Sequence, residues 1–167
     1  MLAQLLRRPM NVSPDLLGSK LYDEKTFYPA FIKDLNNCGS ELIIESPFIT
    51  RRRLQQLLPT LQKLKDRRVR IIINTKDPRE LDEEQRDKTN QVIASLLHKG
   101  MQVVYTHGHH RKLAIIDRNI LYEGSLNILS QNRSSEIMRR TESVRMAWEM
   151  ARFVGVDRTS DKLSHRY

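Results

Sequence analysis

The stretch 110–127, HRKLAIIDRNILYEGSLN, predicts a local fold and holds most of the candidate chemistry of this chain. Two apolar, partly β-branched runs flank the polar tripeptide 117–119, which predicts a tight turn between two strands. We therefore expect a β-hairpin whose second strand ends in the glycine turn GSLN. Side chains two apart in a strand point the same way, so His110 and Lys112 are predicted to share one face.

Upstream of the hairpin, the sequence predicts a βαβ unit. The apolar segments 41–49 and 69–75 are strand-like, and leucines at helical spacing lie between them. Thr50 is the expected helix cap and Pro59 an expected kink or break. Strand, helix, strand at this spacing favours a parallel pair with a right-handed crossover.

The remaining patterns complete a single α/β domain. Helices are predicted over 23–37, over a segment that ends at Gly100, and over 143–153, with a third strand at 101–106. The segment after Asn127 is predicted to be a polar loop or strand edge. We expect a mixed β-sheet flanked by helices on both faces.

Three segments are expected along the chain. Residues 1–20 form an arm or linker, 21–155 the catalytic domain, and 156–167 a charged tail without periodicity. The first segment is either an arm that packs on this domain or on a neighbouring chain, or the tail of a longer parent protein.

Charge and composition narrow the class of partner. A net charge of +9 over 167 residues favours a polyanion, either nucleic acid or an anionic membrane face. No apolar run approaches the roughly 18 residues that span a bilayer, and the start has the reverse order of a secretory signal. Cys38 is the single cysteine, which is typical of a reducing compartment. We expect a cytoplasmic protein without stable membrane association.

The residues of the hairpin suit phosphodiester chemistry. Cleavage requires a nucleophile, a proton donor for the leaving oxygen, and hydrogen-bond donors around the other phosphate oxygens. His110 suits the first two tasks, Lys112 supplies charge, and Ser125 and Asn127 supply donors. No carboxylate cluster is present to hold Mg²⁺, so we expect no metal and no other cofactor. Double displacement through a phosphohistidine needs two imidazoles, and the single motif therefore predicts a homodimer that shares one active site.

The pattern HxK, four residues, Asp, six residues, GSxN resembles that of the phospholipase D superfamily, without a gap or a mismatch. The chain as a whole is similar to the superfamily's small single-motif bacterial endonucleases, which act as dimers. The resemblance implies a phospholipase D-like fold and a role for each motif residue. His110 would be the nucleophile in one subunit and the acid/base in the other, Lys112 and Asn127 would bind phosphate oxygens, Ser125 would support the phosphate site, and Asp117 would orient hydrogen bonds around it.

Further candidates lie on either side of the hairpin. Members of the superfamily often carry a glutamate soon after GSxN that hydrogen-bonds the catalytic imidazole, and Glu136 is that candidate here. Arg139 and Arg140 are candidates for nucleic-acid backbone contact. His107 and His109 lack a fourth metal ligand at convincing spacing, so we expect them at the pocket rim or in solvent.

The motif indicates the reaction but not the groups on either side of the phosphorus. Basic charge and the compact single-motif form favour a metal-independent, non-specific endonuclease, with DNA favoured over RNA. Aromatic content of only 6% speaks against sequence-selective stacking. Two alternatives stay open: a phospholipase D or phosphatidyltransferase acting on lipids, and a nucleic-acid-binding module of a larger helicase or restriction system.

Overall fold

The structure, a computed structural model, describes residues 13–155. Residues 1–12 of the expected arm and the whole expected tail, 156–167, lie outside the described residues. The elements are, in chain order, η1 (Pro14–Leu16), β1 (Lys20–Asp23), α2 (Phe27–Asn37), β2 (Glu41–Glu45), α3 (Arg51–Asp66), β3 (Arg70–Lys76), η2 (Pro78–Glu80), α4 (Glu83–His98), β4 (Gln102–Thr106), β5 (Leu113–Ile116), β6 (Ile120–Gly124), β7 (Ile137–Glu142) and α5 (Val144–Val154).

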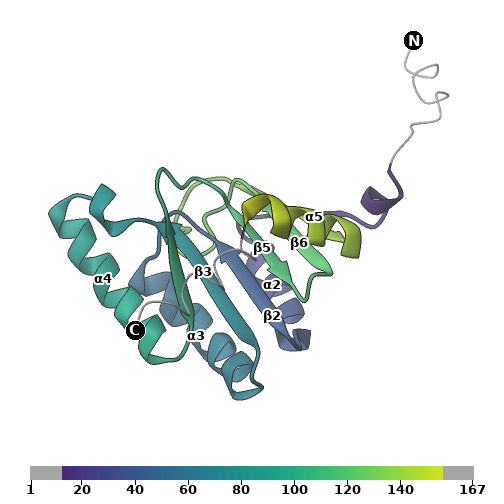
Figure 1. Ribbon diagram of the computed structural model, residues 1–167. Coiled ribbons are helices and arrows are strands. Elements are labelled where there is room, and N and C mark those ends of the chain that lie inside the picture. The colour runs from purple at the N-terminus through teal and green to yellow at the C-terminus, as the bar shows by residue number, and fades with distance from the viewer. Residues whose placement is uncertain (1–12, 156–167) are drawn as a thin grey trace, which may run out of the picture.

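One mixed sheet of seven strands runs through the described part of the chain, in the order β1-β7-β6-β5-β2-β3-β4. Figure 1 labels four of these strands, β6, β5, β2 and β3. β2, β3 and β4 are parallel neighbours, and α3 connects β2 to β3 as the predicted βαβ unit. The other pairings are antiparallel. Because β5 is antiparallel to β2, the segment that precedes β5 arrives at the edge where β2 ends.

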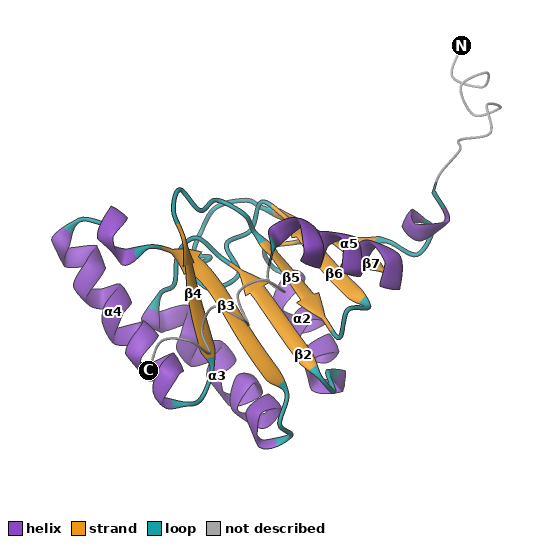
Figure 2. Cartoon of the chain, viewed as in Figure 1, coloured by secondary structure: helices purple, strands orange, loops and turns teal. Residues whose placement is uncertain are grey.

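Helices cover both faces of the sheet (Figure 2). On one face α2, α3 and α4 form the larger core, in which Phe31, Leu61 and Ile44 are buried together. On the other face α5 contributes Ala147 to a smaller buried cluster that includes Ile115. The expected α/β domain with helices on both faces is confirmed. Within residues 13–155 no helix combines the length and the apolar character needed to cross a membrane.

The predicted hairpin is present, but its first strand begins at Leu113, so His110 and Lys112 lie in the preceding loop and not on one face of a strand as expected. The turn of the hairpin explains the polar tripeptide. Asp117 and Arg118 both have positive φ, 51° and 52°. The Asn119 N–H closes the turn on the carbonyl oxygen of Ile116 at 3.0 Å. Two successive positive φ angles match the right-handed twist of the flanking strands, which is why such turns join β-hairpins.

The structure differs from the sequence prediction at several places. β1 is not predicted, and it pairs with β7, which the sequence leaves as a loop or a strand edge. β1 is short and largely exposed, so it carries no apolar run, and only its distant partner reveals it. The first helix begins at Phe27 and not near Asp23, because Asp23 lies in β1. The helix α3 continues through Pro59.

Candidate active site

The HxK segment lies at the edge of the sheet where β2, β3 and β4 end. β5 pairs with β2 so that Leu113 stands opposite Glu45. The loop 107–112, which joins β4 to β5, is therefore held at that edge. His110 is exposed there, and Nζ of Lys112 donates to the His110 carbonyl oxygen at 2.8 Å. The two residues expected to attack and to bind a phosphate lie together on an accessible loop.

The glycine turn after β6 lies beside this loop. The Gly124 N–H donates to the Lys112 carbonyl oxygen at 3.2 Å. A Cβ on Gly124 would lie 2.9 Å from Cα of Met138 and would overlap the carbonyl oxygen of Ile137, so β7 can approach only a glycine. Ser125 donates its N–H to the Ile137 carbonyl at 2.9 Å and accepts the Ile137 N–H on Oγ at 3.1 Å. Ser125 therefore fastens the end of β6 to the start of β7.

Asn127 begins the turn that follows the glycine turn. Its carbonyl oxygen accepts the N–H groups of Ser130 at 3.1 Å and Gln131 at 2.7 Å. Its Oδ1 is buried and has no hydrogen-bond partner in the described part of the chain. Buried polar atoms are nearly always paired, and an exception calls for a functional explanation. A buried amide oxygen without a partner suits a ligand-binding role.

Glu136 directly precedes β7 at the same edge. Its backbone N–H donates to Oε2 of Glu24 at 3.0 Å, and its side chain is half-buried. Its hydrogen bond to the catalytic imidazole stays a prediction. The structure brings five of the predicted site residues to one edge of the sheet: His110, Lys112, Ser125, Asn127 and Glu136.

Asp117 lies at the opposite end of β5. Its carboxylate accepts the backbone N–H groups of Gly39 at 2.8 Å, Ser40 at 2.8 Å and Glu41 at 2.9 Å, and the Ser40 hydroxyl at 2.7 Å. Burial raises the pKa of this carboxyl, but the hydrogen bonds lower it further, to about 2. Asp117 therefore joins the hairpin turn to the start of β2, and the structure does not bring it to the phosphate-binding residues.

The two predicted arginines lie on opposite faces of β7. Arg139 points to the α5 face, where its Nη1 donates to Oγ of Ser19 at 3.0 Å. Arg140 points to the α2 face, where its Nε donates to Oδ2 of Asp34 at 2.6 Å, and Tyr122 donates its hydroxyl to the same oxygen at 2.5 Å. The structure places Arg139 near the candidate site and Arg140 in a partly buried ion pair.

A second polar cluster, which the sequence analysis does not identify, lies under the loop 107–112. Glu45 at the end of β2 is fully buried and accepts from Nδ2 of Asn74 at 2.9 Å and from Nε of Arg111 at 2.6 Å. Nε2 of His109 lies 3.5 Å from the same carboxylate. His109 is 2% exposed, so the expectation of a rim or solvent position is wrong for it. The available signal was a charged residue that closes an apolar strand.

The same loop is also held from outside. Oε2 of Glu80 accepts the Gly108 N–H at 3.0 Å, and Nδ1 of His107 lies 3.4 Å from Oε1. His107 is exposed, as expected. Two carboxylates, Glu45 within the fold and Glu80 at its surface, therefore fix the loop that carries His110. Among residues 13–155, no group of three or more His, Cys, Asp and Glu side chains is arranged to hold a metal ion.

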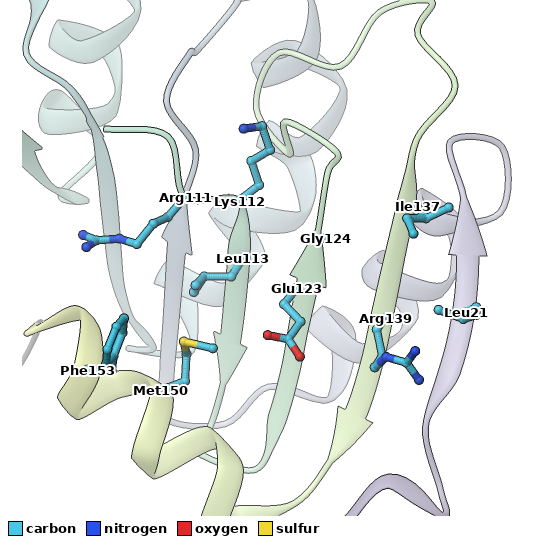
Figure 3. A pocket seen from close by; sticks show the side chains of 10 residues that line it. All are labelled: Leu21, Arg111, Lys112, Leu113, Glu123, Gly124, Ile137, Arg139, Met150 and Phe153. Atoms are coloured by element: carbon cyan, nitrogen blue, oxygen red, sulfur yellow. The ribbon is translucent and has the colours of Figure 1, made fainter. Parts of the chain in front are cut away.

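A hollow of about 510 Å³ opens on the α5 face next to the HxK segment (Figure 3). Lys112 and Gly124 lie at its upper end in that view, and Met150 and Phe153 of α5 lie at the other side. The residues that line it are Leu21, Arg111, Lys112, Leu113, Glu123, Gly124, Ile137, Arg139, Met150 and Phe153. We call this surface the α5-side hollow.

This arrangement brings an imidazole, a cation and amide and hydroxyl groups to one edge of the sheet. A phosphodiester bound there could be attacked by the imidazole while the cation balances charge on the phosphate oxygens. Within residues 13–155, this edge holds no second imidazole of the same motif to protonate the leaving oxygen. His109 does not serve, because it is buried under the loop.

The comparisons with known proteins agree with this geometry. Residues 31–154 match the family described as "Cardiolipin synthase, PLD-like domain". No curated protein sequence matches the chain.

Solved structures share the fold at low sequence identity. NucT from Helicobacter pylori is similar with a TM-score of 0.65 and 15% identity, over 81% of this chain and 91% of that one. Nuc from Salmonella typhimurium, a phospholipase D family member, has a TM-score of 0.63 and 14% identity, over 81% of this chain and 90% of that one. Polyphosphate kinase from Porphyromonas gingivalis has a TM-score of 0.67 and 12% identity, over 93% of this chain but 28% of that one.

The family model covers most of the described domain, including every residue gathered at the catalytic edge. The fold is shared over most of the length of NucT and Nuc. The chain belongs to the phospholipase D superfamily, as a phospholipase D-like domain.

Proposed function

We propose that this chain is a metal-independent phosphodiesterase that cleaves DNA as a non-specific endonuclease, through a phosphohistidine intermediate in a homodimeric active site. The observation that carries the proposal is the meeting of His110, Lys112 and Asn127 at one edge of the sheet, with a buried amide oxygen left unpaired. Family membership supports phosphodiester chemistry at that edge.

The reaction proceeds by two displacements at phosphorus. A ring nitrogen of His110 attacks the phosphorus, and the bond to one ester oxygen breaks as His110 of the partner subunit gives that oxygen a proton. The product is a phosphohistidine and a free hydroxyl end. Water then attacks the phosphorus, the partner's His110 takes a proton from it, and the bond to the first imidazole breaks.

The other residues hold charge and geometry through both steps. Lys112 and Asn127 bind the non-bridging oxygens, where negative charge must be balanced in each transition state. Ser125 keeps the glycine turn in position through its two hydrogen bonds to Ile137. Glu136 holds the far ring nitrogen of an imidazole and so favours its protonated form.

The second imidazole comes from a twofold dimer. The surface that would meet the partner is the α5 face beside the HxK segment, where large apolar side chains lie exposed: Leu21 at 61%, Ile137 at 61% and Phe153 at 82%. They surround the α5-side hollow, which Lys112 also lines. Exposed apolar side chains that adjoin an incomplete site support a protein partner at this face.

Nucleic acid is the proposed substrate because of charge. The net charge of +9 suits a polyanion, and backbone contacts give binding without sequence preference. Few aromatic side chains are present for stacking on bases. Cys38 is buried and free, which supports the proposed cytoplasmic location.

Cleavage of plasmid DNA in excess EDTA, with His110→Ala beside the unmodified protein, tests the proposal. We expect nicked and linear products from the unmodified protein alone. Cleavage that EDTA abolishes, or that His110→Ala retains, would contradict it. Binding of DNA without any turnover would instead support a nucleic-acid-binding module.

A lipid substrate is the second candidate, because the matched family is described by a cardiolipin synthase. The apolar part of the α5-side hollow could accommodate an acyl chain. Incubation with phosphatidylglycerol vesicles separates the two candidates. Release of glycerol or formation of cardiolipin, lost in His110→Ala, would favour the lipid substrate.

A further inference from the structure

Arg111 lies between His110 and Lys112, and one hydrogen bond orients its guanidinium. Its Nε donates to Oε2 of Glu45 at 2.6 Å, and 36% of its side chain is exposed. No hydrogen bond occupies Nη1 or Nη2 within residues 13–155. A guanidinium has five N–H donors in a planar fork, and here the outer four remain available to an anion.

Glu45 is a rigid anchor for that guanidinium. It is fully buried, and its Oε1 accepts from Nδ2 of Asn74 at 2.9 Å. Asn74 in turn exchanges hydrogen bonds with the Thr106 hydroxyl, at 3.0 Å and 3.1 Å. This chain of bonds links the ends of β2, β3 and β4. A buried polar network that is well paired restricts the movement of its members.

His109 does not replace Arg111 as the counter-charge of Glu45. Burial lowers the pKa of the His109 imidazole, and the nearby carboxylate of Glu45 offsets this only in part. His109 is therefore neutral near pH 7. The guanidinium of Arg111 is the cation that balances Glu45, and it is kept beside the catalytic loop.

The side chains of Arg111 and Lys112, the two cations of the segment 110–112, point to different places. In Figure 3 the side chains of Arg111 and Lys112 leave adjacent positions in different directions, with Arg111 reaching across the ribbon toward the neighbouring strand. A phosphate that contacts Lys112 and His110 is therefore not the group that the outer nitrogens of Arg111 would meet. They would meet an anion one position along an extended substrate.

We propose that Arg111 binds a backbone phosphate adjacent to the scissile phosphate, and that Glu45 is the positioning residue that aims its guanidinium. This inference rests on the proposed function, DNA cleavage. Guanidinium groups bind phosphate through paired N–H donors, which requires a fixed orientation. In a twofold dimer the two copies of Arg111 would lie on either side of the shared site, and only a polymer presents phosphates at both positions. Arg111 thus selects a polymeric substrate over an isolated phosphodiester.

The ratio of kcat/KM for a short DNA duplex to that for bis(4-nitrophenyl) phosphate measures this selection. Arg111→Gln should lower the ratio about 10- to 100-fold, the loss expected for one charge-assisted contact. Arg111→Lys keeps the charge but replaces the planar fork and its paired outer N–H donors with a single nitrogen, and it should give an intermediate loss. Arg68→Gln is the matched control for charge, because Arg68 is exposed at the other edge of the sheet and its φ of 63° strains either residue equally.

Glu45→Gln tests the positioning role. Glu45→Gln removes the negative charge and leaves a single side-chain oxygen for the two donors Asn74 and Arg111, so the bond that aims the guanidinium is weakened. The ratio should fall as in Arg111→Gln. The ratio of the double variant should be little lower, because both substitutions remove the same interaction. Additive losses, or equal losses on both substrates, would show a merely structural pair and overturn the inference. Circular dichroism checks that each variant folds, and Arg111→Gln alone decides the case if Glu45→Gln does not.

Two further outcomes separate this inference from the proposed function. If unmodified protein cuts DNA and Arg111→Gln leaves the ratio unchanged, the inference fails and the nuclease stands. If unmodified protein cuts no DNA, the salt dependence of duplex binding decides: Arg111→Gln should lower the slope of log K against log salt by about one for each phosphate contact removed. An unchanged slope would overturn the inference. A change in the mass of the oligomer of Arg111→Gln, measured by ultracentrifugation, would also overturn it, because it would place Arg111 in a subunit contact.

Discussion

The two ends of strand β5 carry residues of the same sequence motif, and the polar groups at these two ends are hydrogen-bonded in opposite ways. At the Asp117 end, the carboxylate accepts four hydrogen bonds from Gly39, Ser40 and Glu41. At the other end, the edge that carries His110, Oδ1 of Asn127 is buried and has no hydrogen-bond partner within residues 13–155. Roughly 13 Å of strand separates the two ends.

The difference separates the structural part of the motif from its chemical part. A fully paired carboxylate stabilises the fold and leaves nothing for a ligand. Unpaired buried groups cost stability, and a folded protein retains them where the chemistry needs them. Residues that look equivalent in the pattern HxK…D are therefore expected to respond differently to substitution.

The largest effect is expected at the His110 end. His110→Ala removes the nucleophile and, in a dimer, the acid/base as well, so kcat should fall at least about 10⁴-fold. The side chain is exposed, and its loss should shift the free energy of unfolding by no more than about 0.5 kcal/mol. Oligonucleotide cleavage in EDTA and urea denaturation measure the two quantities. A large loss of stability in His110→Ala would contradict the proposed difference between the two ends of β5.

Gly124→Ala is the expected exception at the His110 end, because Gly124 affects stability through packing. The added Cβ would overlap the backbone of Ile137 and Met138, so the strands β6 and β7 must separate. We expect a loss of about 3 kcal/mol in unfolding free energy, at the upper end for a single substitution. Gly18→Ala, where nothing lies within 4 Å of an added Cβ, is the matched control and should change little. Equal stabilities in urea denaturation would refute this account of the glycine.

Asp117→Asn should reduce stability by about 2 kcal/mol, because the depressed pKa measures how strongly the fold prefers the ionised form. A carboxyl with a lowered pKa contributes stability above its ordinary pKa of about 4. That contribution is lost as the pH falls toward about 2. The difference in unfolding free energy between the unmodified protein and Asp117→Asn should be constant near neutral pH and should shrink below about pH 4.

Urea denaturation at several pH values checks this prediction. Asp87→Asn on the exposed surface of α4 is the control. Cleavage by Asp117→Asn, assayed where the variant is folded, should stay within a few-fold of the unmodified protein. A loss of activity as large as that of His110→Ala would place Asp117 in the chemistry and break the comparison.

The smallest effect is expected next to the Asp117 end, at Trp148. This side chain is 43% exposed, and the Arg118 guanidinium lies 4.9 Å from its ring centroid. Trp148→Ala should cost about 0.5 to 1 kcal/mol, the range of exposed cation–π contacts. Trp148→Phe keeps an aromatic face and should recover part of the loss. A cost above about 3 kcal/mol would indicate a buried role after all.

The sequence by itself determined the parts of the molecule that depend on local patterns. The hairpin follows from two apolar runs around a polar turn, and α3 and α5 follow from helical spacing after Thr50 and Ser143. The spacing of the motif was sufficient to identify the superfamily, because it sets the segment before one strand and the turn after the next strand at a fixed distance along the chain.

The tertiary structure decided what depends on pairing and burial between distant segments. β1 exists because it pairs with β7, and Arg139 and Arg140 differ because strand alternation sends them to opposite faces. The cluster of Glu45, Asn74, His109 and Arg111 draws its members from separate strands and one loop. The charge of Glu45 at the end of an apolar strand was the one local signal of this group. Its other members meet only at the common edge where the parallel strands end, and that edge exists only once the sheet has formed.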